Sequence, residues 1–322
     1  HSWEYPRNKA FPGHANPAVE GKAKSFRRAR VMANGDLIGI YNGSGMIRLN
    51  HRSEPMWTLD VRCHHDLDIG ADGVLYTLIQ KKAMHADINP DEPIIDELIA
   101  MVDPETGRII RQISIINAFR ASIYAPLLKK MPQTGDVLHA NTIVHINAAT
   151  AGVSPLFHEN HLLVSLRNMD AIALIDPNRS RVVWALTGMW SLQHEPSILP
   201  SGNILIFDNT GHRGRSKILE FDPMTQVPVW QYGLTPDTAI FSSTSGACHR
   251  LPNGNTFIIE SNRGRAVEVT TLGKTVWLFN NPSTWGPNNN LRGTLFDVVR
   301  IPPDFFSPDI SASLVSDSLA AL

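Results

Sequence analysis

The sequence predicts an all-β fold, a β-propeller built from four-stranded blades. Three observations predict it: recurrent Asn-Gly and Asp-Gly turns between short apolar runs, an Asp-led turn after the third run of several units, and tryptophans at near-constant spacing. Asn-Gly and Asp-Gly between β-rich runs are the strongest local hairpin signals. A four-stranded unit that recurs every roughly 40–50 residues is typical of a propeller blade.

Five such units can be recognised along the chain. They are expected at Phe26–Asp60, His65–Ile115, His139–Thr187, His194–Gly233 and Gly246–Asn280. Four units carry a tryptophan in the fourth strand, at positions 57, 184, 230 and 277, and the last three are spaced by 46 and 47 residues. We expect these indoles in the core between blades. Because one such sheet buries too little apolar surface alone, the units should close into a ring.

Both ends of the chain are expected to complete the ring. A further strand is predicted at Thr294–Arg300, and with the N-terminal stretch it would form a composite sixth blade. We therefore expect six blades rather than five, in a single domain over residues 1–322. Long insertions are expected at Lys81–Leu98 and Asn117–Asp136, and Pro282–Asn290 is expected to be a loop.

The amino-acid composition and net charge limit the kinds of partner that the protein is expected to bind. The 322 residues are 43% hydrophobic and 18% charged, which is typical of a soluble globular protein. A net charge of -1 argues against a nucleic-acid or membrane-surface partner, because both usually require excess basic charge. No apolar run approaches the roughly 18 residues of a membrane span.

Two features bear on the compartment. The chain begins at His1, which removal of an export signal would explain, as would other trimming, so a periplasmic or secreted location is expected. Cys63 and Cys248 are the only cysteines, and they either form one bridge or remain two buried thiols.

Histidines recur where the first strand of a unit begins. In a propeller blade the first strand lines the central channel, so these starting points share one face of the ring. A single histidine there is most often a structural residue, but four at one position favour a functional cluster at the channel mouth. The four are His65, His139, His194 and His249.

Polar residues also follow the second strand of the units. Because a hairpin returns to where it began, they are expected on the same face as the histidines. Asparagine is a good turn residue, so the asparagines are expected to be mainly structural. The asparagines are Asn42, Asn168, Asn209 and Asn262, and the accompanying basic residues include Arg167, Arg213, Arg215 and Arg263.

Imidazoles beside guanidinium groups suit a tetrahedral oxyanion. Arginine matches sulfate or phosphate with a bidentate fork, and histidine can donate a hydrogen bond, shuttle a proton or act as a nucleophile. No Gly-rich phosphate loop appears, so nucleotide-dependent transfer is not indicated. Four neutral histidines could instead hold a transition metal. Nearby arginines would repel a cation, so we expect neither a metal nor another cofactor.

Four ordered motifs resemble the arylsulfotransferase family. They are "DVLHANTIVHI", "LLVSLRNMDAIALIDPNRSRVVWALTG", "QHEPSILPSGNILIFDN" and "HRLPNGNTFIIESNRGRAVEVTTLGKTVWLF". The resemblance covers about Asp136 to Phe279. Members of this family move a sulfuryl group from a phenolic ester to another phenol without a nucleotide. The resemblance implies a six-bladed propeller and a two-step mechanism through an N-sulfo-histidine.

The resemblance also implies roles for individual residues. His139 matches the histidine of the Asp-x-x-His-x-Asn motif, and His194 matches that of the Gln-His motif; both would help to bind the sulfuryl group. Arg213 or Arg215 would clamp its oxygens. His249 is the candidate nucleophile, and His194 is also the candidate proton donor to the leaving oxygen. Further substrate-binding candidates are His65, Arg167, Asn209 and Arg263.

Three functions remain open on the sequence. The first is sulfuryl transfer, with an aryl sulfate and a phenol as the small-molecule partners. The second is a non-catalytic propeller that binds a ligand or a protein on its His/Arg face, and the third is a metal-bearing propeller. The natural donor and acceptor and the oligomeric state stay undetermined.

Overall fold

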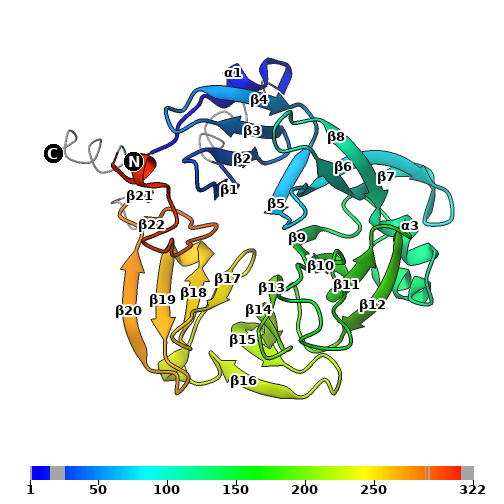
Figure 1. Cartoon of the computed structure of the whole chain (residues 1–322). Helices are drawn as coiled ribbons and strands as arrows, with labels where there is room; N and C mark the ends of the chain where they lie inside the picture. The colour runs from blue at the N-terminus through cyan, green and yellow to red at the C-terminus, as the bar shows by residue number, and fades with distance from the viewer. Residues whose placement is uncertain (1, 15–25, 287, 289–290, 313–322) are drawn as a thin grey trace.

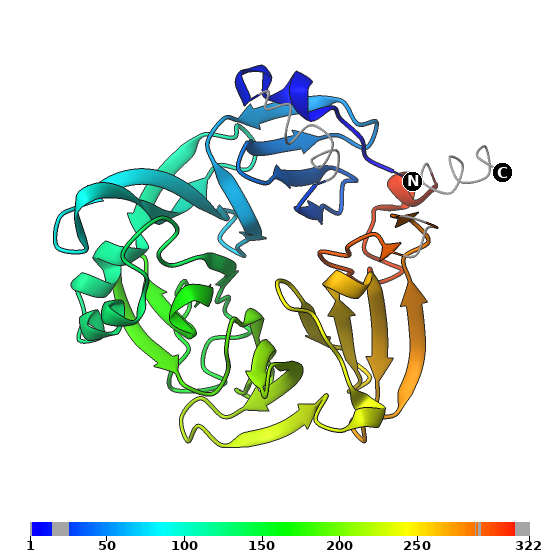
Figure 2. The same cartoon turned by 180° about the vertical axis from the view of Figure 1, so that it is seen from behind.

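Five four-stranded antiparallel sheets stand in a ring in the computed structural model, which describes residues 2–14, 26–286, 288 and 291–312 (Figure 1). In each sheet the strands pair in chain order. The first strand faces the centre of the ring and the fourth lies at the rim, and Figure 2 shows the same arrangement from behind. The predicted class, a β-propeller of four-stranded blades, is confirmed.

The first two blades span the N-terminal half of the described chain. The first consists of β1 (Arg28–Val31), β2 (Leu37–Tyr41), β3 (Gly45–Leu49) and β4 (Pro55–Leu59). The second consists of β5 (Cys63–Ile69), β6 (Leu75–His85), β7 (Asn89–Val102) and β8 (Ile109–Ser114).

Three further blades follow. The third consists of β9 (Ala140–His145), β10 (Leu162–Leu166), β11 (Ala171–Asp176) and β12 (Arg181–Thr187). The fourth consists of β13 (His194–Ile198), β14 (Ile204–His212), β15 (Arg215–Phe221) and β16 (Pro228–Tyr232). The fifth consists of β17 (Ala247–Arg250), β18 (Thr256–Glu260), β19 (Arg265–Val269) and β20 (Thr275–Asn280).

The two predicted insertions have different structures. Lys81–Leu98 extends the second blade, because β6 and β7 continue as a long hairpin whose pairing extends to His85 and Asn89. The second insertion contains the helix α3 (Ile115–Arg120) and the 3-10 helix η2 (Ala125–Lys130). The Ser114 hydroxyl caps α3 by accepting a hydrogen bond from the Asn117 N–H.

The expected sixth blade is not formed by the described residues, which contain five four-stranded sheets. Thr294–Arg300 is not a strand. Leu295 and Val298 instead pack on the face of the fifth blade around Phe257, and Arg300 pairs with Glu268 at 2.5 Å. The apolar residues of this segment therefore indicate burial against a blade, without the ladder of hydrogen bonds that a strand requires.

Segments from both ends cover the facing surfaces of the first and fifth blades. The N-terminal segment contains α1 (Arg7–Ala10) and the 3-10 helix η1 (Pro12–His14), and buries Phe11 against Tyr41 and Ile47 of the first blade. The C-terminal segment reaches the first blade too, because the Ser307 N–H donates to the Ala33 carbonyl. A short pair is formed by β21 (Thr284–Trp285), inside the stretch expected to be a loop, and β22 (Leu291–Arg292), just beyond it.

The tryptophans of the fourth strands lie at the rim, and three of them pack against the core between blades, as expected. Trp57, Trp184 and Trp230 are half-buried against the clusters that join neighbouring blades, whereas Trp277 is 40% exposed. The indole N–H of Trp57 donates to the Pro104 carbonyl at 2.8 Å, and that of Trp230 donates to the Thr271 carbonyl at 2.8 Å. Each bond joins one blade to the next, so these two indoles act as ties between neighbouring outer edges.

The cysteines are two buried free thiols. Cys63 packs between the first and second blades, and Cys248 packs between the fourth and fifth. Burial raises the pKa of the Cys63 thiol to about 12, which keeps it protonated. The cysteines thus give no argument about the compartment. Among the described helices, none is long and apolar enough to cross a membrane.

Candidate active site

Three of the predicted histidines meet at one end of the ring. The rings of His65 and His139 have centroids 4.8 Å apart. Burial holds the pKa of His65 well below its usual value, and His64, Arg27, His139 and His194 lower it further by their proximity. A set of five side chains from the first four blades is therefore gathered here, called the mouth cluster below: Arg27, His65, His139, Arg167 and His194.

Arg27 was not among the residues predicted for the site. It lies eight residues before the turn glycine Gly35, the same interval that separates His65 from Gly73 and His194 from Gly202. Counting back from the hairpin glycines is thus the signal that finds it. Burial, and then the neighbouring Arg28, lower the pKa of Arg27 to about 10, so it remains a cation at neutral pH.

Irregular backbone turns these side chains toward one another. A β-bulge interrupts β5 after His64, β9 after Ala140 and β13 after His194. Left-handed φ angles accompany them, 55° at His65 and 51° at His139. A bulge re-aims a side chain, and non-glycine residues in the left-handed region concentrate at functional sites.

His194 is held in one tautomer by two oxygen acceptors. Its Nδ1 lies 2.8 Å from the Asn209 side-chain oxygen and 3.0 Å from the Leu192 carbonyl oxygen. Both partners accept, so Nδ1 carries the proton and Nε2 carries a lone pair. Burial lowers the pKa of His194 to about 3, and the ring is neutral at physiological pH. Nε2 has no hydrogen-bond partner within the described part of the chain.

His139 and Arg167 are fixed by local contacts. The His139 Nδ1 lies 2.6 Å from the Asp136 carboxylate, which also accepts the backbone N–H of His139. Arg167 begins the 3-10 helix η3 (Arg167–Met169), and its N–H donates to the His139 carbonyl at 3.1 Å. Arg167 is close enough to His194 to lower the pKa of that ring. Both residues therefore belong to one polar wall of the cluster.

The remaining predicted arginines lie elsewhere. Arg213 and Gly214 form a two-residue turn between β14 and β15, with φ angles of 51° and 76°, and the exposed Arg213 and Arg215 lie at this hairpin tip. Arg263, at the end of the 3-10 helix η5 (Ser261–Arg263), pairs with Glu260 at 3.1 Å. The structure therefore brings Arg167 into the mouth cluster but leaves these three outside it.

Asn209 is a buried positioning residue. Its side-chain N–H groups donate to the carbonyls of Ser242 and Ser245, at 2.6 and 2.8 Å, while its oxygen faces His194. These bonds tie the end of β14 to the connection between the fourth and fifth blades. Asn209 therefore orients the imidazole of His194, and its amide has no free donor for a ligand.

His249 lies in a different, charged environment. It precedes its turn glycine, Gly254, by five residues instead of eight, and β17 has no bulge. The His249 Nε2 contacts Asp297 of the C-terminal segment at 3.0 Å. It therefore belongs to a second set, called the ionic cluster below: Arg28, Arg30, Asp66, Glu195, His249 and Asp297.

The ionic cluster is centred on the buried Arg28. This guanidinium contacts Asp66 at 2.9 Å and also pairs with Glu195 and Asp297. Burial alone would raise the pKa of Asp297, but Arg28, followed by His249 and Arg30, holds it well below its usual range. Carboxylates thus neutralise the cations of this layer, whereas no carboxylate pairs directly with Arg27 among the described residues. An anionic ligand is favoured at the mouth cluster.

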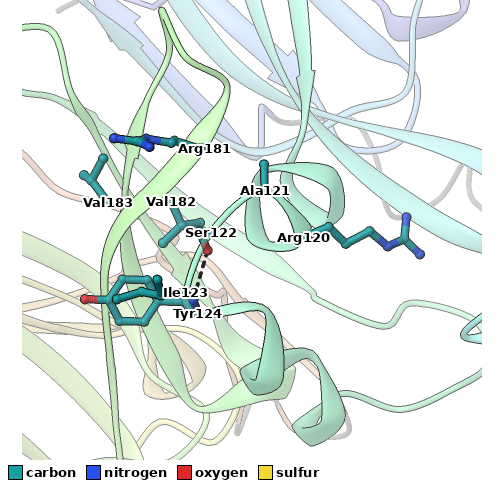
Figure 3. A pocket seen from close by; sticks show the side chains of 8 residues that line it. All are labelled: Arg120, Ala121, Ser122, Ile123, Tyr124, Arg181, Val182 and Val183. Carbon is teal, nitrogen blue, oxygen red and sulfur yellow. Dashed lines mark hydrogen bonds between the residues drawn. The ribbon is translucent and has the colours of Figure 1, made fainter.

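The mouth cluster is neither a metal-binding group nor part of the surface pocket found on the third blade. Within the described residues, no group of three His, Cys, Asp or Glu side chains is arranged to hold a metal ion. A pocket of about 580 Å³ lies between α3 and the outer strand β12 of the third blade, lined by residues such as Tyr124 and Arg181 (Figure 3). Its arginine Arg120 is already paired with Asp87.

Comparisons with known proteins identify a family and a fold. Residues 28–281 match the family described as Arylsulfotransferase (ASST). A search of curated proteins finds no match. A protein of unknown function from Bacteroides caccae has a similar structure, with 14% identity and a TM-score of 0.52, covering 80% of this chain and 82% of that one. Virginiamycin B lyase from Staphylococcus aureus gives 11% identity and a TM-score of 0.46, covering 79% and 69%.

Proposed function

The chain belongs to the arylsulfotransferase (ASST) family, and from this premise we propose that it transfers a sulfuryl group from a phenolic sulfate ester to a phenol, with a sulfo-histidine at His194 as the intermediate. The observation that carries the proposal is the hydrogen bonding of His194. Two acceptors hold the proton on Nδ1, so Nε2 carries the free lone pair and is the reactive atom.

Burial supports the same assignment. An imidazole with a pKa of about 3 stays neutral at working pH, so its nucleophilic form is fully populated. The nearby guanidinium groups of Arg27 and Arg167 match the oxygens of a sulfuryl group and stabilise the charge that is redistributed over them during transfer. His139, oriented by Asp136, adds a further hydrogen-bonding group.

The contacts favour His194 over His249, to which the sequence-based assignment gave the nucleophile's role. His249 shares Asp297 with Arg28 and Arg30, so its Nε2 is engaged by a carboxylate. A negatively charged sulfate ester would approach that carboxylate at an electrostatic cost. His194 lies instead beside two cations, and we assign proton donation to the leaving oxygen to another residue of the mouth cluster.

The reaction proceeds in two balanced steps. In the first, Nε2 of His194 attacks sulfur, the S–O bond to the donor phenol breaks, and an N–S bond forms. In the second, the oxygen of an acceptor phenol attacks sulfur, the N–S bond breaks, and the new sulfate ester forms. The leaving phenolate gains one proton in the first step and the acceptor phenol loses one in the second.

Trapping the intermediate tests the proposal. The protein is incubated with 4-nitrophenyl sulfate alone, quenched, digested with trypsin and analysed by mass spectrometry. His194 lies in the tryptic peptide 182–213 and His249 in 218–250. We expect a mass gain of one sulfuryl group on the first peptide, assigned to His194 by fragmentation, and faster nitrophenol release when phenol is added.

Other outcomes have defined meanings. A label on the second peptide would return the nucleophile's role to His249. A folded protein that releases no nitrophenol and carries no label would contradict sulfuryl transfer and support the propeller as a binding module.

A further inference from the structure

A chain of buried side chains runs from the mouth cluster into the second blade. His65 contacts its neighbour His64, with 2.8 Å between the two Nδ1 atoms. The other nitrogen of His64, Nε2, lies 3.6 Å from the carboxyl group of Glu97 on β7. His64 is 2% exposed and Glu97 is fully buried. The order of groups from the interior to the site is therefore Glu97, His64 and His65.

The contact between the two imidazoles couples their protonation states. Two Nδ1 atoms at hydrogen-bond distance can share only one proton between neutral rings, because one must donate and the other must accept. If His64 donates, His65 accepts on Nδ1 and carries its own proton on Nε2. If His65 donates, its Nε2 is bare. The tautomer of His64 thus dictates whether His65 presents a proton to the site.

Glu97 is in a position to set the tautomer of His64. Its carboxyl oxygens accept the backbone N–H of Ala140 and the side-chain amide of Gln80, and His64 Nε2, 3.6 Å from the carboxyl group, is a buried nitrogen without a hydrogen-bond partner in the described structure. Burial, and then the nearby charge of Asp136, raise the pKa of Glu97 well above its usual value. If the 3.6 Å separation closes to hydrogen-bond distance, a protonated Glu97 donates to Nε2 of His64, which places the proton of His64 on Nδ1.

The charges around the relay leave His64 neutral. Burial lowers the pKa of His64 to about 3; Asp136 opposes this shift, and His139, Arg27 and Arg62 add to it. A carboxyl group on the same strand, Asp96, adds to the raised pKa of Glu97. A neutral acid and two neutral imidazoles in series can move a proton by exchanging tautomers, without burying a net charge on either ring.

We propose that Glu97, His64 and His65 form a proton relay that serves the sulfuryl transfer described above. In the first step, Nε2 of His65 protonates the leaving phenolate oxygen; His65 Nδ1 takes the proton of His64 Nδ1, and His64 Nε2 takes the proton of Glu97. Glu97 is then a carboxylate. In the second step, the acceptor phenol gives its proton to Nε2 of His65, and the same movements in reverse restore the Glu97 acid.

The relay rests on the proposed function and assigns the acid–base step to His65, with His64 and Glu97 as positioning residues. Glu97 holds the transferable proton in the resting enzyme and is a carboxylate while the sulfo-enzyme exists. The relay should contribute most to the rate for phenols that are weak acids, because their anions are poor leaving groups and their hydroxyls are poor nucleophiles until deprotonated.

Leaving-group dependence separates a relay from a structural role. The variants are Glu97→Gln, which keeps the size of the side chain but carries no transferable proton, and His64→Asn, which keeps a hydrogen-bonding group near Nδ1 but breaks the link to Glu97. With phenyl sulfate, whose phenol has a pKa of about 10, we expect kcat/KM to fall by about 10²-fold. With 4-nitrophenyl sulfate, which releases a more acidic phenol, we expect a loss of less than about tenfold.

His145→Asn is the matched control. His145 is also a buried imidazole, and its Nε2 lies 3.6 Å from Asp72, the same separation as that between His64 and Glu97. It stacks on Tyr76 and lies outside the mouth cluster. The control should affect both donors equally. If Glu97→Gln and His64→Asn also reduce turnover of both donors equally, the relay is excluded.

A second measurement does not depend on turnover. Nitrogen-15 spectra of histidine-labelled wild-type protein report which nitrogen of each ring is protonated. The relay requires a proton on Nε2 of His65 and on Nδ1 of His64 in the resting protein. A proton on Nδ1 of His65 would overturn it, even if the variants fail to fold. If the spectra show the expected tautomers but the protein releases no nitrophenol, the result contradicts the proposed function and not the tautomers that the relay requires.

Discussion

The inner strands β13 and β17 belong to adjacent blades, and each carries a histidine, yet the two imidazoles lie in different surroundings. His194 faces an amide oxygen and a carbonyl, beside Arg27 and Arg167, neither of which pairs directly with a carboxylate among the described residues. His249 faces a carboxylate that neutralises two arginines. A shift of three residues relative to the turn glycine separates an imidazole suited to attack an anion from one that serves an ionic network.

The bulge in β13 accounts for part of this difference. It follows His194 directly and places Glu195 at a φ of 49°, so His194 and Glu195 contribute to different layers. β17 pairs without interruption from Ala247 to Arg250. Position along a strand therefore does not define function in this ring; distance from the turn glycine together with the bulge does.

Replacing each histidine should give the largest contrast. With 4-nitrophenyl sulfate as donor, His194→Ala should lower kcat by about 10³-fold or more, because a two-step displacement cannot proceed without its nucleophile. His249→Ala should lower it by less than about tenfold. Steady-state nitrophenol release measures both variants, and circular dichroism confirms that each is folded. The reverse order would invert the comparison.

Removing the carboxylate beside His249 should mainly affect stability. Asp297→Ala leaves Arg28 with one buried partner fewer, and losing one member of a buried ion pair costs about 3–5 kcal/mol. Urea denaturation measures the change in the free energy of unfolding. The control is Glu105→Ala, which removes an exposed partner of Arg48 and should cost less than about 1 kcal/mol. Equal effects would show that the ionic cluster does not hold the ring together.

Removing the amide beside His194 should lower turnover, and it should also cost stability because the carbonyls of Ser242 and Ser245 lose their buried donor. Asn209→Ala takes away one acceptor of the Nδ1 proton and leaves the Leu192 carbonyl. We expect kcat to fall roughly tenfold, which corresponds to one hydrogen bond of about 1.4 kcal/mol. Asn262→Ala is the matched control, because Asn262 holds the loop at Ser242 and Thr244 without contacting a histidine. An equal loss in the control would mean that loop order alone matters.

Protonation of His194 and of Asp297 should lower the stability of the folded protein in different pH ranges. The pKa of His194 is lowered on folding, so the unfolded chain binds more protons and stability falls as the pH drops below about 6.5, by up to about 1.4 kcal/mol per pH unit. Asp297 has a depressed pKa in the folded protein, so its contribution is complete above about pH 4 and is lost only below it.

Variants separate these contributions. His194→Gln should reduce the slope of unfolding free energy against pH between about 6.5 and 5 by up to about 1.4 kcal/mol per pH unit, and the slope due to His64 and His65 should remain. Asp297→Asn should leave the slope unchanged and lower stability throughout. Denaturation at a series of pH values measures both. An unchanged slope in His194→Gln would contradict a neutral, buried His194.

The sequence predicts the blades well because their signal is local. Asn-Gly and Asp-Gly turns fix each hairpin, and the predicted units begin and end within a few residues of the observed sheets. Thr294–Arg300 was mistaken for a strand because burial against Phe257 selects the same apolar residues as pairing does. Its Asp297 is bound by Arg28, a contact that no local pattern reveals.

The site was only partly predictable for the same reason. His65, His139, His194 and Arg167 follow from hairpin geometry, and Arg27 could have been found by counting from Gly35. Glu97 could not, because it comes from a third strand and is defined by a contact with His64 across the sheet. The bulge that separates His194 from His249 shows in the sequence only as the longer interval to the turn glycine, eight residues instead of five.

The contact between Arg28 and Asp297 joins residues that are 269 positions apart. Closing so large a loop costs conformational entropy before any contact offsets it, and contacts of high sequence separation slow folding. During synthesis, the first blade can pair its own strands early, but Arg28 must wait for its partner until nearly 270 further residues have been translated. Arg28 is next to Arg27, so the mouth cluster takes its final shape only at this last stage of folding.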